Sequence, residues 1–192
     1  MRSALLTLLL LAGSSAAAQS GLWAGVNPSR SLQQYESATL SPARIESLHA
    51  LLRQPGSLGS WDCDPSELQE LLRGLRLTAL PVSSGNNVIL AEAGRGCARG
   101  GQGSNGAMWL LRFRGATPVL LASPGAGFNG WLFSVQPATH HGYHDIVLGW
   151  HMSAADTELT YFCFDGKSYH PMGAASLLAD ENGNVTIVPR TK

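Results

Sequence analysis

Residues 143–152 read YHDIVLGWHM, and this stretch decides the fold class because its apolar side chains alternate along the chain. Every second position from Ile146 to Met152 is apolar, which is the period of a β-strand with one buried face. We expect this face to point inward and the face that carries Asp145 and Val147 to lie opposite. Similar apolar runs, separated by turns rich in Gly, Asn and Asp, fill the second half of the chain. They predict an antiparallel β-meander of about seven to nine strands.

Leucines at helical spacing before residue 76 predict two short helices. Ser41 stands directly before a proline, which is typical of an N-cap followed by the first helical turn. Asp64, with Glu67 three residues later, resembles a capping box. We expect the two helices to pair as a hairpin, joined by a loop around Trp61.

The first 18 residues have the features of a signal peptide. Arg2 supplies a positive start, a run of nine residues at 4–12 that is apolar except for Thr7 follows, and residues 16–18 form an A-x-A cleavage site. A run of nine residues is too short for the hydrocarbon core of a membrane, which needs about 20. We expect cleavage after Ala18, no membrane insertion, and a mature protein in the periplasm or outside the cell.

These features together predict the domain organisation of the chain. An α+β fold follows from the helices and the meander, which form a single domain over residues 41–192. The predicted parts are a signal peptide at 1–18, an extended lead-in at 19–40, a helical hairpin at 41–75 and a β-meander at 76–192.

The 192 residues carry 13 basic and 13 acidic side chains, so the formal net charge is zero. This balance gives no electrostatic footprint for nucleic acid or for an anionic membrane. A hydrophobic share of 44% excludes a disordered chain. We therefore expect a globular protein without a nucleic-acid partner.

Three cysteines occur, and export permits them to form one disulfide in any of three pairings. Cys63 and Cys97 both lie in polar, turn-like segments, whereas Cys163 lies in an aromatic strand pattern. We favour the pair Cys63–Cys97, with Cys163 buried as a small apolar residue.

The densest group of polar side chains is the segment HHGYHD at residues 140–145. His140, His141 and His144, with Asp145, are candidate ligands of a metal ion because imidazole and carboxylate groups bind transition metals. The alternative is a solvated polar turn in which Asp145 accepts hydrogen bonds from nearby backbone N–H groups.

Other motifs do not meet the geometry that their chemistry needs. Two G-x-G-x-x-G segments, at 101–106 and 125–130, lead into strands, whereas a dinucleotide site needs a helix there. No serine lies in the G-x-S-x-G pattern of a nucleophile elbow. We therefore predict no catalytic residue and no cofactor other than a metal ion.

Aromatic side chains outside the predicted strand cores are candidates for ligand binding. Trp23 and Trp61 lie outside regular elements, so we expect both near the surface, and Tyr143 belongs to the histidine-rich turn. Trp109, Trp131 and Trp150 fall on predicted core faces, where burial is the ordinary outcome.

Two motifs, GYHDIVLG at 142–149 and FDGKSY at 164–169, resemble a broad, poorly characterised group of secreted, β-rich bacterial proteins. The first motif is also similar to the D-L-V-V-G strand of FG-GAP and VCBS propeller blades. The resemblance implies a β-rich fold and an exported location. It does not imply calcium, because residues 139–142 lack acidic side chains. The group often has a second cysteine after Cys97, where this chain has Ala107.

An exported, non-catalytic binding module is the function that these observations favour. Its ligand would be a protein or a component of the cell envelope, and an inhibitor of an envelope hydrolase fits this description. The alternative is a metal-dependent hydrolase or metal-handling protein that uses His140, His141 and His144.

Overall fold

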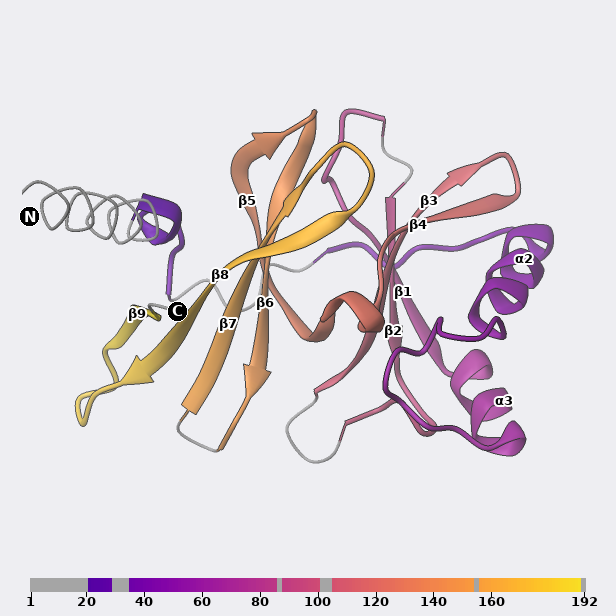
Figure 1. Ribbon diagram of the computed structural model, residues 1–192, viewed down its shortest axis with the longest axis horizontal. Coiled ribbons are helices and arrows are strands. Elements are labelled where there is room, and N and C mark those ends of the chain that lie inside the picture. The colour runs from indigo at the N-terminus through magenta and orange to yellow at the C-terminus, as the bar shows by residue number, and fades with distance from the viewer. Residues whose placement is uncertain (1–20, 29–34, 86–87, 101–104, 154–155, 191–192) are drawn as a thin grey trace, which may run out of the picture.

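The computed structural model describes residues 21–28, 35–85, 88–100, 105–153 and 156–190 (Figure 1). The fold is mostly β: nine antiparallel strands form one sheet in the order β1-β2-β3-β5-β6-β7-β8-β9, and β4 pairs with β3 beside this path. The predicted meander is confirmed. The strands are β1 (Leu75–Ala79), β2 (Val88–Ala93), β3 (Gly106–Arg114), β4 (Thr117–Ala122), β5 (Asn129–His140), β6 (Tyr143–His151), β7 (Asp156–Phe164), β8 (Tyr169–Ala179) and β9 (Val185–Arg190).

Two short helices precede the sheet, α2 (Pro42–Leu52) and α3 (Pro65–Arg73). The capping box of α3 is confirmed, because the Asp64 side chain accepts from the N–H groups of Ser66 and Glu67 while Glu67 accepts from the N–H of Asp64. Pairing of the helices as a hairpin is not clearly shown. Instead, each helix packs buried leucines against the sheet beside β1–β4 (Figure 1).

The N-terminal part of the chain differs from the extended lead-in that we expected. The predicted signal peptide at 1–18 lies outside the described residues. Residues 21–23 form a helical turn that packs on the sheet, and residues 36–38 pair with β1 through the bridge between Ser37 and Thr78. In the part of the chain that the structure describes, no helix is long and apolar enough to cross a membrane.

Three clusters of buried apolar side chains make up the core. The first lies within the middle of the sheet, the second lies under α2 and α3, and the third lies under residues 21–28. Their largest members are Phe128, Phe162 and Tyr169 in the first, Trp109 and Phe113 in the second, and Trp23, Phe133 and Tyr161 in the third.

Both faces of β6 are buried, although the alternation predicted one inward face. Ile146 and Leu148 belong to the first cluster as expected, but Val147 is fully buried in the third. Trp23 explains the difference, because it covers this second face and meets the Tyr161 ring edge-on at 5.6 Å. Met152 was expected in the core and is instead exposed.

Strand β5 carries a bulge opposite Asp145. Val135 pairs with Ile146 and Thr139 pairs with His144, so three residues of β5 stand opposite one residue of β6. Pro137 lies in this bulge, where its missing N–H removes no ladder bond. Residues 136–138 of this bulge line one pocket together with Asp145.

A disulfide joins Cys63, before α3, to Cys97, after β2, with the Cα atoms 5.4 Å apart. Cys163 is the free cysteine and is buried. Both cysteine predictions are confirmed. The disulfide is consistent with an oxidising compartment.

Removing this disulfide tests how much it stabilises the fold. Because it closes a loop of 34 residues, the double variant Cys63→Ala/Cys97→Ala should lose about 3–4 kcal/mol of unfolding free energy. Urea unfolding measures the loss. The control is added reductant, which should destabilise the parent and leave the variant unchanged. Equal stability of parent and variant would contradict this expectation.

Gly130 occupies a position that no other residue can fill. Its φ is +109°, and a Cβ atom there would overlap the backbone oxygen of Gly149. Gly115 also has a positive φ, +62°, but open space surrounds it. The two glycines therefore separate backbone strain from steric overlap.

Alanine at these two sites should have different effects on stability. We expect Gly115→Ala to cost about 1 kcal/mol of unfolding free energy, through backbone strain alone. Gly130→Ala adds the overlap with Gly149 and should cost at least about 3 kcal/mol. Thermal and urea unfolding of the two variants measure the costs, and similar values for both would show that the approach of β5 to β6 is not tight.

Candidate functional site

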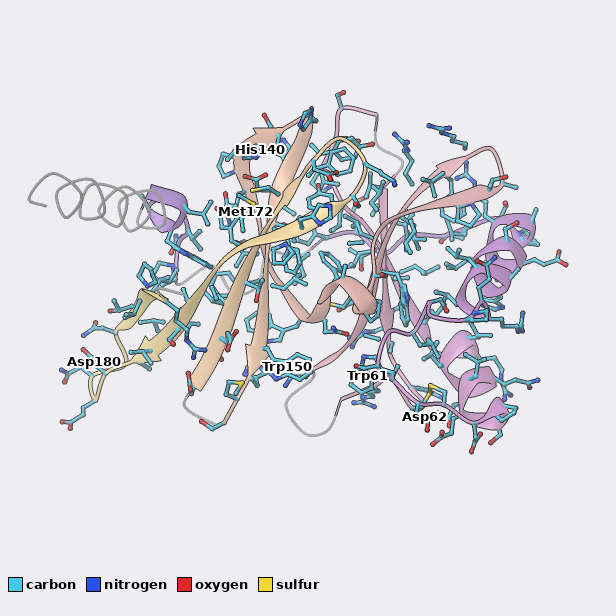
Figure 2. The ribbon with its side chains drawn as sticks, viewed as in Figure 1. Trp61, Asp62, His140, Trp150, Met172 and Asp180 are labelled. Carbon is cyan, nitrogen blue, oxygen red and sulfur yellow. A yellow bond between two sulfur atoms is a disulfide. The ribbon has the colours of Figure 1, made fainter. Side chains whose placement is uncertain are left out.

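The turn between β5 and β6 places side chains beside two pockets. His141 has φ +49° and Gly142 has φ +78°, which is the pattern of a primed two-residue hairpin turn. One pocket lies beside Arg112 and the other lies beside Asp145, and we name each after that residue. The labelled His140 marks this end of the sheet (Figure 2).

The Arg112 pocket has a volume of about 410 Å³ and lies between β3, residues 83–85 and the β5–β6 turn. Residues 82–83 are hydrogen-bonded to β6. The N–H of His144 donates to the backbone oxygen of Val82 at 2.7 Å, and Ser83 forms a β-bridge with Tyr143. Polar side chains on its wall are Ser83, Ser84, Arg112, His141 and Tyr143.

Arg112 is half-buried and has no acidic partner. Its Nη1 donates to the Tyr143 hydroxyl at 3.1 Å, and its buried Nε has no hydrogen-bond partner within the described residues. All 13 acidic residues of the sequence lie in the described ranges, and none of them forms an ion pair with Arg112. The positive charge is therefore available to a ligand.

Tyr143 is held in place by aromatic neighbours. Its ring centroid lies 4.2 Å from that of Phe164 and 6.5 Å from that of Tyr169. Because the Tyr143 oxygen accepts the bond from Arg112, its hydroxyl hydrogen can donate to a molecule in the pocket. Guanidinium and hydroxyl donors thus point to the binding of an anion.

The Asp145 pocket has a volume of about 340 Å³ and lies between residues 21–25, the β5 bulge and β6. Asp145 is fully buried at its base. Its Oδ1 lies 2.7 Å from His140 Nδ1, and its Oδ2 accepts from the Tyr161 hydroxyl at 3.1 Å. The Cys163 sulfur also lies within 4.8 Å of an oxygen of this carboxyl group.

Burial and the carboxylate of Asp145 both raise the pKa values of the neighbouring Tyr161 hydroxyl and Cys163 thiol. Burial is the larger cause, and with Asp145 it raises the pKa of the Cys163 thiol to about 12. The same two causes raise the pKa of the Tyr161 hydroxyl well above its usual range. Both groups therefore stay protonated at neutral pH, and the Tyr161 hydroxyl donates to the carboxylate.

The structure brings together only part of the predicted metal-ligand group. His140 and Asp145 form a group with Cys163, and the ligand atoms of these three residues lie within 4.8 Å of one another. His144 instead places its Nδ1 2.8 Å from the backbone oxygen of Gln136. His141 lines the Arg112 pocket. The alternative of a solvated Asp145 bonded to backbone N–H groups does not hold, because side chains surround this buried carboxylate.

The aromatic candidates Trp23 and Trp61 differ in how deeply they are buried. Trp23 is 5% exposed, because the helical turn that carries it packs on the sheet, so the expected surface position is wrong. Trp61 is half-buried, and its Nε1 donates to the Asn129 side chain at 3.0 Å. Tyr143 contributes to a pocket, as described above.

Sequence reasoning missed Arg112 and Cys163. The sequence assigns no role to Arg112, and its aromatic strand pattern predicts Cys163 as a small apolar residue. Their neighbours come from distant segments, residues 83–85 and 140–145, so no local spacing signals either group.

The chain matches no protein-family model, no curated protein and no solved structure. The resemblance of residues 142–149 and 164–169 to secreted β-rich proteins therefore remains a prediction.

The reactivity of Cys163 tests the buried group around Asp145. At pH 9 a thiol with a pKa of about 12 is almost wholly protonated, whereas an unfolded cysteine, pKa about 8.5, is mostly thiolate. Alkylation of folded protein by iodoacetamide should be at least about 100-fold slower than in urea. Mass spectrometry follows the reaction, with the reductant omitted so that the disulfide stays intact. Equal rates in the two states would show that the thiol is accessible.

Proposed function

We propose that this protein is an exported, non-catalytic binding module whose Arg112 pocket takes an anionic group of a protein or cell-envelope ligand. The observation that carries the proposal is the half-buried guanidinium of Arg112, which no carboxylate of the chain neutralises. The predicted signal peptide and the disulfide between Cys63 and Cys97 support export.

An unpaired charge away from water is costly, so such a group is retained where a ligand supplies its partner. Arginine suits carboxylate and phosphate because its planar N–H groups match two oxygens at once. Ser83 and Ser84 add hydroxyl groups to the same wall, and no acidic residue is among the described residues that line it. An anion therefore meets donors without meeting a like charge.

The alternative function, a metal-dependent hydrolase or metal-handling protein, would need a set of ligands other than the predicted His140, His141 and His144. Its predicted ligands His141 and His144 lie apart from the group formed by His140, Asp145 and Cys163. The binding module is preferred because the pocket beside Arg112 offers donors for an anion.

Isothermal titration calorimetry tests the proposal with three probes: a short peptide with a free C-terminal carboxylate, the same peptide with an amidated C-terminus, and inorganic phosphate. We expect the parent to bind the free peptide or phosphate more tightly than the amidated peptide. Arg112→Gln should weaken binding about 10- to 150-fold, as loss of a charge-assisted hydrogen bond does. Tyr143→Phe, which keeps the ring, should weaken it about 3- to 10-fold.

Two further variants control this experiment. Arg73→Gln removes an exposed cation on α3 whose Nε donates to the Gln69 backbone oxygen, away from the pocket, so binding should be unchanged. Gly85→Phe fills the Arg112 pocket from an uncrowded position and should abolish binding, whereas Gly25→Phe fills the Asp145 pocket and should not. The proposal fails if the parent binds no probe, or if Arg112→Gln binds as the parent does.

A further inference from the structure

Three neighbouring strands bring three kinds of metal ligand to one point. His140 ends β5, Asp145 lies on β6 and Cys163 lies on β7. Because Ile146 pairs with Phe162 in antiparallel register, the residues that flank this pair, Asp145 and Cys163, lie opposite each other. The nitrogen, oxygen and sulfur atoms of the group all lie within 4.8 Å of one another.

The environment of Asp145 favours a cation. The carboxylate is fully buried, and in this structure its Oδ1 meets His140 Nδ1 while its Oδ2 accepts from the Tyr161 hydroxyl. A metal ion would supply a positive partner directly.

We propose that His140, Asp145 and Cys163 bind one borderline-soft transition metal ion, for which zinc is the best fit. Carboxylate oxygens alone would suit magnesium or calcium, but imidazole and thiolate select zinc and its neighbours in the transition series. The inference concerns the Asp145 pocket and is independent of the proposed anion site beside Arg112.

The surroundings meet the other needs of a metal site. Tyr161 donates to the second oxygen of Asp145 and fixes the carboxylate, as the hydrogen-bonded neighbours of metal ligands commonly do. The Asp145 pocket gives a path from solvent, with room for a water molecule or a ligand atom at a fourth position. Three protein ligands with one open position result.

Charge and protons balance without an oxidant or a reductant. Zinc forms a bond to Cys163 Sγ as the S–H bond breaks, and this proton leaves to solvent through the Asp145 pocket. Zinc bonds to His140 Nδ1 as the imidazole proton is carried on Nε2, so the ring stays neutral. One proton is released for each ion bound by the neutral-imidazole form.

Native mass spectrometry and cobalt(II) titration test the site on the full chain purified from a bacterial periplasm. We expect one zinc ion per chain, and a thiolate-to-cobalt absorption band on addition of cobalt. Cys163→Ser should remove the band, and both Cys163→Ser and His140→Ala should weaken zinc binding at least about 10-fold. The control is His170→Ala, which removes a second histidine that is paired with an aspartate, Asp165 at 2.9 Å, and should change nothing.

His140→Ala keeps the test decisive if Cys163→Ser does not fold, because the His140 side chain is 51% exposed and its loss spares the core. The proposal is overturned if the parent takes up no metal at stoichiometric zinc. It is also overturned if His141→Ala abolishes binding while His140→Ala and Cys163→Ser bind as the parent does, since the ion would then sit on the exposed turn.

Discussion

Burial of both faces of β6 is the constraint on which the rest of the structure depends. One face packs into the middle of the sheet through Ile146 and Leu148, and the other is covered by Trp23 and Val26. Because Asp145 belongs to this strand, closing the second face removes a carboxylate from water. The protein then has to surround that charge with donors from β5 and β7. The positions of His140 on β5 and Tyr161 on β7 follow from that requirement.

The bulge in β5 and the turn after it resolve the conflict between a regular ladder and a buried charge. A regular strand would place one residue opposite Asp145, whereas the bulge places three there and brings His140 back to the carboxylate. The turn then directs Tyr143 toward Arg112. A single irregular hairpin therefore organises both pockets, although register shifts also occur where β3 pairs with β4 and where β7 pairs with β8.

Local features of the sequence were enough to predict the meander, the capping box of α3 and the Cys63–Cys97 disulfide. The first two depend on residues close in sequence, and three cysteines allow only three pairings. Local periodicity failed for Val147 and Trp23, since alternation reports one buried face and cannot show that a distant segment covers the other. The candidate sites were only partly predictable for the same reason. His140, Asp145 and Tyr143 lie in one polar run, but Arg112 and Cys163 join them only through strand pairing.

The two end strands of the path from β1 to β9 have a consequence for how copies of this protein behave at high concentration. An open sheet exposes backbone N–H and C=O groups that can template a strand from another molecule, which leads to fibrous aggregation. Residues 36–38 already pair with the outer side of β1. At the other end β9 contains Pro189, which has no N–H to offer, and its Arg190 is paired with Glu158. Both ends of the path from β1 to β9 thus discourage the addition of a strand from another molecule.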